Sequence, residues 1–102
     1  MDKVVYRHIR LDSNQVFYIG MGNKSRPYQK INRNEYWHFI VKKFGYKVDI
    51  VANNLTKEKA LELEHQLIKF YGRIIEGGTL VNMKDDSRSE EPKIKKIKAK
   101  IS

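Results

Sequence analysis

Two runs of β-forming residues, with four polar residues between them, restrict the fold of this chain more than any other segment. The first run covers residues 4–11 (VVYRHIRL) and the second covers residues 16–20 (VFYIG), while residues 12–15 (DSNQ) are typical of a turn. So short a link predicts that the two runs pair as an antiparallel β-hairpin.

Two later segments have the end residues and the periodicity of helices. They are residues 35–44, between Asn34 and Gly45, and residues 57–71, between Thr56 and Gly72. Their apolar residues, expected to face the core, are Tyr36, Trp37, Ile40, Val41 and Phe44 in the first, and Ala60, Leu61, Leu63, Leu67, Ile68, Phe70 and Tyr71 in the second. With an alternating run at residues 46–52, they predict an α+β fold: a small, three-stranded, mainly antiparallel sheet flanked by helices.

Composition narrows the class of protein. The chain has 102 residues and no cysteine, which fits one domain with a modest core and excludes disulfides and thiolate metal sites. It has no signal-peptide pattern and no apolar run of the length of a membrane span, so we expect a cytoplasmic protein that does not bind membranes. The net charge of +9 favours a polyanionic partner; nucleic acid ranks ahead of an anionic membrane surface, so the expected partner is DNA and not a membrane.

The C-terminal end differs in composition from the rest. Residues 85–92 are polar and residues 93–102 (KIKKIKAKIS) are rich in lysine, so we predict a domain over residues 1–84 and a flexible basic tail over residues 85–102. The stretch over residues 21–34 is predicted to be a loop and carries further positive charge.

Glu64 has an unusual position in the second helix, because it falls near the middle of the apolar face, between Ala60 and Ile68. Burial of an unpaired carboxylate is costly, so Glu64 needs either a partner inside the fold or a role as a metal ligand or acid/base group.

Other side chains are suited to phosphate chemistry. Lys24 and Arg26 are cations that can bind phosphate, and Tyr6 and Tyr18 are phenols that can hydrogen-bond a water molecule. With a single carboxylate, this set favours phosphodiester chemistry that uses one hard cation with several water ligands.

The order of these residues resembles the GIY-YIG nucleases. Residues 4–6 (VVY) stand where that family has GIY, and residues 18–20 (YIG) reproduce its second motif. Arg26 matches the arginine that follows, Glu64 the metal-binding glutamate on a later helix, and Asn82 the asparagine near the end of the domain. The resemblance covers most of the predicted domain and is greatest with the compact restriction-type and phage-type branch.

The resemblance implies a metal-dependent DNA endonuclease that hydrolyses phosphodiester bonds with one Mg²⁺ or Mn²⁺ ion per site, held by Glu64. It makes Tyr6 the candidate general base, while Tyr18 positions the water or the phosphate. Arg26 neutralises charge on the phosphoryl oxygens, and His38 is an alternative proton acceptor.

The resemblance also suggests contacts with DNA and structural support for the site. Gly20 and Gly22 are expected to let the backbone turn sharply without a side chain that blocks DNA, and Asn82 is expected to buttress the site. The residues expected to bind nucleic acid are Lys24, Arg26, Tyr28, Lys30 and Arg33.

Two departures from the family pattern keep other functions open. Met21 stands where relatives often have lysine, and the sequence after Asn82 is MKDDS where relatives often have MTDGG. A catalytically silent DNA-binding or regulatory module is one alternative. A basic protein-interaction module, with Glu64 paired inside the fold, is another. The sequence leaves open whether a homodimer or a partner protein supplies specificity.

Overall fold

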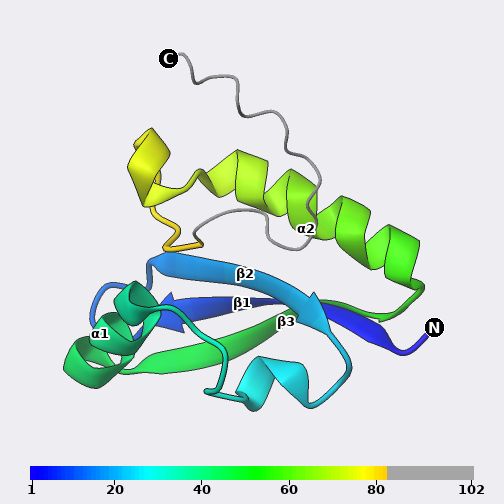
Figure 1. The fold of residues 1–102 in the computed structure, drawn as a ribbon, viewed down its shortest axis with the longest axis horizontal. Helices are drawn as coiled ribbons and strands as arrows, with labels where there is room; N and C mark the ends of the chain where they lie inside the picture. Colours follow the sequence, from blue (N-terminus) through cyan, green and yellow to red (C-terminus); the bar gives the residue numbers. More distant parts are fainter. Residues whose placement is uncertain (83–102) are drawn as a thin grey trace.

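The computed structural model describes residues 1–82, so the predicted basic tail at residues 85–102 lies outside the described residues. These 82 residues form a small α+β domain with a three-stranded antiparallel sheet and two helices (Figure 1). In chain order the elements are β1 (Lys3–Arg10), β2 (Val16–Gly22), the 3₁₀ turn η1 (Arg26–Tyr28), α1 (Glu35–Phe44), β3 (Tyr46–Leu55), α2 (Lys57–Tyr71) and the 3₁₀ turn η2 (Ile74–Glu76).

The predicted hairpin is confirmed, and β1 becomes the central strand of the sheet, in the order β2-β1-β3. In this register Tyr6 lies opposite Gly20 on β2 and Ile50 on β3, while His8 lies opposite Tyr18. Strand β2 continues to Gly22, two residues beyond the predicted end.

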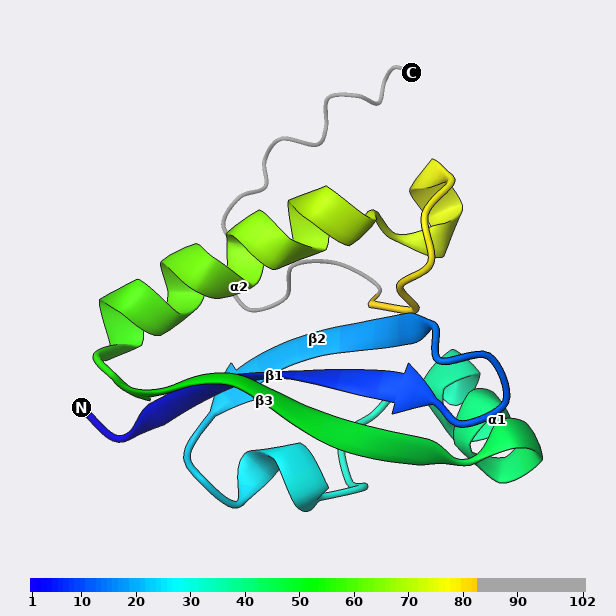
Figure 2. The same ribbon diagram turned by 180° about the vertical axis from the view of Figure 1, so that it is seen from behind.

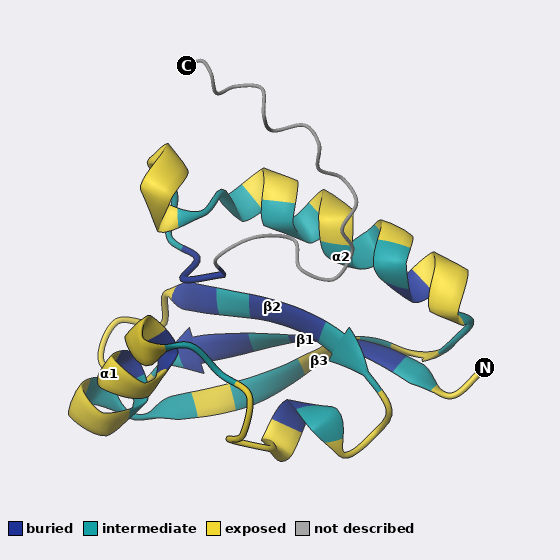
Figure 3. Ribbon diagram, viewed as in Figure 1, coloured by how far each residue is buried: buried dark blue, intermediate teal, exposed yellow. Residues whose placement is uncertain are grey.

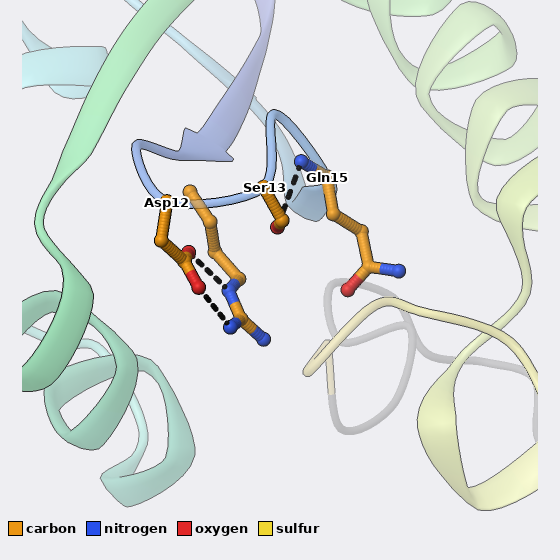
Figure 4. Close-up of polar contacts among 4 residues, drawn as sticks. Asp12, Ser13 and Gln15 are labelled. Atoms are coloured by element: carbon orange, nitrogen blue, oxygen red, sulfur yellow. Dashed lines mark hydrogen bonds and ion pairs between the residues drawn. The ribbon is translucent and has the colours of Figure 1, made fainter.

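The turn of the hairpin is held by its own polar side chains (Figure 4). The Arg10 guanidinium donates to both carboxylate oxygens of Asp12, at 2.9 and 2.7 Å. Ser13 Oγ accepts the backbone N–H of Gln15 at 3.3 Å, and Asn14 takes the left-handed conformation that the turn requires, with φ of 60°.

Both helices begin and end where the sequence predicts. The side chains of Asn34 and Thr56 each accept a backbone N–H in the first turn of the helix that follows. Gly45 and Gly72 end the helices with φ of 76° and 77°, a region that glycine enters without a steric penalty.

The two faces of the sheet have different coverings. Helix α2 packs an aliphatic core on one face, and α1 and η1 cover aromatic residues on the other. The first core contains Val5, Ile9, Val16, Ile19, Ala60 and Leu80, and the second contains Phe17, Trp37, Ile40 and Val81. In Figures 1 and 2, α2 follows the β2 side of the sheet, and α1 and η1 lie on the other side of that strand.

Two residues of the predicted apolar stripes face solvent. Tyr36 of α1 is 60% exposed and Phe70 of α2 is 79% exposed, so their assignment to buried helix faces was wrong. Each lies at the margin of the stripe that the helical period defines, and the sides of both helices that face away from the sheet are exposed (Figure 3).

The segment after α2 returns to the edge of the sheet. The turn η2 was not predicted, because its three residues are too few to show a helical period. The chain then pairs with β2, where the Val81 N–H donates to the Phe17 carbonyl at 2.8 Å. In the described part of the chain, no helix has the length and apolarity that crossing a membrane requires.

Candidate active site

Tyr6 lies at the centre of β1, and the absence of a side chain at Gly20 makes room for its ring. A Cβ atom added at Gly20 would lie 2.3 Å from the Tyr6 hydroxyl oxygen. The expected sharp turn at Gly20 and Gly22 was wrong, because β2 runs through both and the positive φ angles in residues 1–82 lie elsewhere. Gly20 is therefore needed for close packing of Tyr6.

Gly22 has a similar steric role toward the η1 loop. A Cβ atom at Gly22 would lie 2.8 Å from Cβ and Cγ of Arg26. The glycine thus lets the loop that carries Arg26 approach the end of β2.

Arg33 joins the loop to the tyrosines. Its Nη1 donates to the Tyr6 hydroxyl at 3.0 Å, and its guanidinium carbon lies 5.0 Å from the ring centroid of Tyr18 and 5.5 Å from that of Trp37. Its Nη2 donates to the Arg26 carbonyl at 3.0 Å. Arg33 therefore holds the loop against Tyr6 and Tyr18. Its predicted role in binding nucleic acid is a separate one.

Tyr6 is a neutral phenol at neutral pH. Its side chain is 1% exposed, and burial, followed by the neighbouring Tyr18, raises its pKa above the ordinary value of 10.0. The positive charges of Arg33 and Arg26 oppose this rise without overcoming it. A general base must hold a proton-free oxygen, so the raised pKa does not favour Tyr6 as a ready-made base.

His8 is a central residue of this face that the sequence reasoning did not single out. Its Nδ1 accepts the indole N–H of Trp37 at 2.9 Å, and its Nε2 lies 2.8 Å from the Pro27 carbonyl oxygen. Because a carbonyl can only accept, Nε2 carries the proton and the ring is neutral. The available signal was its position two residues after Tyr6, which places both on one face of β1.

The pKa of His8 is lowered to about 4, chiefly by burial and also by the charges of Arg33 and Arg26, while the hydrogen bond to Pro27 acts in the opposite direction. The ring also lies within 5.0 Å of Tyr6 and stacks on Tyr18 at 5.5 Å between centroids. His8 therefore ties the sheet, α1 and η1 together as an uncharged group.

Arg26 is held rigidly by its own loop. Its Nη1 donates to Gln29 Oε1 at 3.3 Å and to the Ile31 carbonyl at 3.0 Å, and its Nη2 donates to the Asn32 carbonyl at 3.3 Å. A guanidinium has five N–H donors, so within residues 1–82 the Nε–H and one Nη2–H remain for another acceptor. Those two atoms form one edge of the guanidinium, the edge that can grip a phosphate with two hydrogen bonds.

The other predicted surface residues are solvent-exposed. Lys24, Tyr28 and Lys30 extend from the loop. His38 is exposed on α1, where its ring lies against that of Trp37 at 5.0 Å. Within residues 1–82, no hydrogen bond or ring contact joins any of these four residues to Tyr6.

Glu64 is half-buried on α2, and its Oε1 atom is shielded from solvent. Helix α2 covers the face of Val5 and Ile19, which is opposite to the face of Tyr6 because successive strand residues alternate. Across residues 1–82 the contacts of Tyr6 do not include Glu64. Strand β2 is an edge strand, so it borders both faces of the sheet, and α2 lies along it (Figure 2).

The donor set on the described residues suits a weakly ligated hard cation better than a closed metal cage. Residues 1–82 contain no group of three histidine, aspartate or glutamate side chains that could hold a metal ion together. A single half-buried carboxylate, that of Glu64, fits a Mg²⁺ ion that retains most of its water ligands. A two-metal site does not fit this part of the chain.

Asn82 fixes the last described residues to the middle of β2. Its Nδ2 donates to the Ile19 carbonyl at 2.8 Å, and its Oδ1 accepts the Ile19 N–H at 3.1 Å. Because the side chain is buried and uses both hydrogen-bonding ends on one residue, it holds β2 directly beside Tyr18 and Gly20.

Comparisons of the chain with protein-family models, with curated proteins and with solved structures gave no match.

Proposed function

We propose that this protein is a metal-dependent DNA endonuclease of the GIY-YIG type, which hydrolyses phosphodiester bonds with one Mg²⁺ or Mn²⁺ ion per site. The observation that carries the proposal is the rigid pairing of Tyr6 with Gly20 across two strands, with Tyr18 alongside and the open edge of Arg26 beside the end of β2. Phenols and a preorganised guanidinium on one face are suited to a phosphate and its attacking water.

In this proposal, three side chains on the Tyr6 face have separate roles. Arg26 binds the phosphoryl oxygens through Nε and Nη2. Tyr18, which is half-buried, orients the phosphate or the water. Tyr6 orients the attacking water through a hydroxyl that Arg33 holds in place, since its raised pKa keeps it protonated at neutral pH.

Glu64 would hold the cation, whose charge stabilises the leaving oxygen when it is bound. Glu64 and Tyr6 lie on opposite faces of the sheet, so the proposal places the phosphate at the edge strand β2, between α2 and the Tyr6 face. Excess positive charge on the chain favours DNA as the polyanion. A homodimer or a partner protein would let one site per chain cut both strands.

One set of observations favours the alternative, a catalytically silent DNA-binding or regulatory module. Tyr6 is 1% exposed with a raised pKa, and its contacts within residues 1–82 run to Arg33, His8 and Tyr18 and not to Glu64. These contacts are also those of a tyrosine whose ring only fills the interior and takes no part in a reaction. The two functions differ in cleavage and not in binding.

Plasmid cleavage in Mg²⁺ and in Mn²⁺ tests the proposal, with Glu64→Gln compared against Glu62→Gln. Both carboxylates lie on α2, but Glu62 is exposed and Glu64 is half-buried. We expect wild type and Glu62→Gln to nick the plasmid, and Glu64→Gln to lose cleavage while it retains DNA binding in a gel-shift assay.

Folded wild-type protein that binds DNA and cuts no plasmid with either metal would support the silent module. Cleavage by Glu64→Gln at the wild-type rate would remove Glu64 as the metal ligand. Circular dichroism of each variant shows whether a loss of activity comes from loss of the fold.

A further inference from the structure

The outward side of α1 carries two aromatic rings that the fold leaves uncovered. Tyr36 is 60% exposed and Phe39 is 59% exposed, although Trp37 and Ile40 of the same helix are buried. Residues three positions apart lie on one side of a helix, so the two rings form a common surface. A single exposed aromatic residue is ordinary, whereas a contiguous apolar patch is typical of a surface that binds a partner.

Positive charge accompanies the two rings. Lys43 Nζ lies 5.5 Å from the ring centroid of Phe39, and Lys42 and His38 are exposed on the same helix. The acidic residue of α1, Glu35, lies at its first turn, away from these lysines. Figure 3 shows that the outward side of α1 is exposed.

Tyr36 also forms one wall of an apolar pocket of about 100 Å³. The other walls are Ile74, Ile75, Leu80, Val81 and Asn82. Helix α1 and η2 lie at the same end of the sheet (Figure 1), and the Asn34 side chain donates to the Val81 carbonyl at 2.9 Å, which fixes the two walls together. With no charged side chain in its walls, the pocket suits an uncharged flat ring better than a phosphate.

We infer that the α1 surface, formed by Tyr36, Phe39 and Lys43, binds unpaired bases of single-stranded or branched DNA. Aromatic rings stack on any exposed base, and the ammonium group neutralises the phosphate that follows it. Bases within a duplex are already stacked on one another and cannot reach these rings. The inference rests on the proposed function for the choice of DNA, and adds the class of substrate.

The charges of the surface favour DNA over a second copy of the chain. Each α1 carries Lys42 and Lys43 against a single acidic residue, Glu35, in a chain of net charge +9, so two copies brought together repel one another. A DNA strand supplies the opposite charge at regular spacing.

Fluorescence anisotropy with a labelled single-stranded oligonucleotide, and with the duplex of the same sequence, tests the inference. The variants are Tyr36→Ala and Phe39→Ala, with Phe70→Ala as control, because Phe70 is 79% exposed on α2. We expect each α1 variant to weaken single-strand binding about five- to one-hundredfold and to leave duplex binding within twofold. Phe70→Ala is expected to bind both DNAs as wild type does.

Three results would overturn the inference. They are wild-type affinity for the single strand in both α1 variants, an equal loss for single strand and duplex, and self-association of the wild type that Phe39→Ala abolishes.

The inference and the proposed function can fail separately. Single-strand binding that depends on the Tyr36 and Phe39 rings, in a protein that cuts no DNA, would refute the endonuclease and leave the inference standing. Duplex cleavage by a protein whose affinity for single strands is unchanged in Tyr36→Ala and Phe39→Ala would refute the inference and leave the endonuclease standing. Circular dichroism confirms that the variants fold.

Discussion

The two faces of the sheet hold the same strands by different means. On the face of α2, aliphatic side chains such as Val5, Ile9 and Leu80 pack without directional bonds. On the face of α1 and η1, the indole of Trp37 donates to one ring nitrogen of His8, and the Pro27 carbonyl accepts from the other.

The difference shows where this small domain requires accurate geometry. Aliphatic packing tolerates changes of shape when volume is kept, whereas a buried polar network is destabilised by any unsatisfied member. The face of α1 and η1, called the network face below, also carries Tyr6, Tyr18 and Arg26, so three of the residues proposed for chemistry are held by directional hydrogen bonds, whereas Glu64 lies on α2 over the other face.

The largest effect is expected from Trp37→Ala, on the network face. The fully buried indole is lost together with the donor to His8 Nδ1, so we expect a loss of about 3–5 kcal/mol in the free energy of unfolding. Urea unfolding gives the value. Leu63→Ala on the other face removes a half-buried side chain and should cost clearly less. An equal cost would show that the two faces do not differ in this way.

Acid is expected to weaken the network face through His8. The unfolded chain protonates His8 near the ordinary pKa of 6.5 and the folded protein only near 4, so protons favour the unfolded chain between these values. We expect the unfolding free energy to fall by roughly 3 kcal/mol as pH drops from 7 to 4, from this residue alone. Urea unfolding across this range should show a shallower fall in His8→Gln.

The exposed His38 supplies the control for the acid effect. His38→Gln should keep the full wild-type dependence on pH. A His8→Gln protein whose stability falls as steeply as that of the wild type would assign the acid sensitivity to other groups.

A smaller effect is expected from Gly20→Ala, which changes a single contact on the network face. The added methyl group meets the Tyr6 ring, so we expect a loss of about 1–3 kcal/mol. In a Tyr6→Leu background, which lacks the outer ring atoms, the same change should cost much less. Equal costs in the two backgrounds, measured by a double-mutant cycle, would mean that Gly20 does not serve to accommodate Tyr6.

Much of the fold was predictable, because its signals are local. Asn34 and Gly45 bounded α1 correctly, since cap and stop residues act within one turn of the helix. The exposure of Tyr36 and Phe70 was not predictable, because it depends on how each helix is tilted against the sheet. The periodicity of apolar residues predicts which side of a helix faces the core, but it does not predict which residues at the edges of that side are buried.

The site was predictable only in part. The shared face of Tyr6 and Tyr18 follows from strand alternation and hairpin pairing. The bond from Arg33 to Tyr6 joins residues 27 positions apart through a loop whose only regular element is the short turn η1, and no sequence pattern specifies such a path. The role of Glu64 stays a prediction, since its position in the helix is local but the surroundings of its carboxylate depend on tertiary packing.

The most direct test compares the loss of one hydroxyl on each face. Tyr6→Phe removes the hydroxyl that Arg33 holds, and Tyr71→Phe removes one that Arg7 Nη1 contacts at 2.9 Å on the α2 side. Because the Tyr6 hydroxyl is proposed to orient the attacking water, we expect Tyr6→Phe to lower the rate of plasmid cleavage about 100-fold, with fold and DNA binding retained. Tyr71→Phe should stay within twofold of wild type. Cleavage by Tyr6→Phe at the wild-type rate would contradict the account.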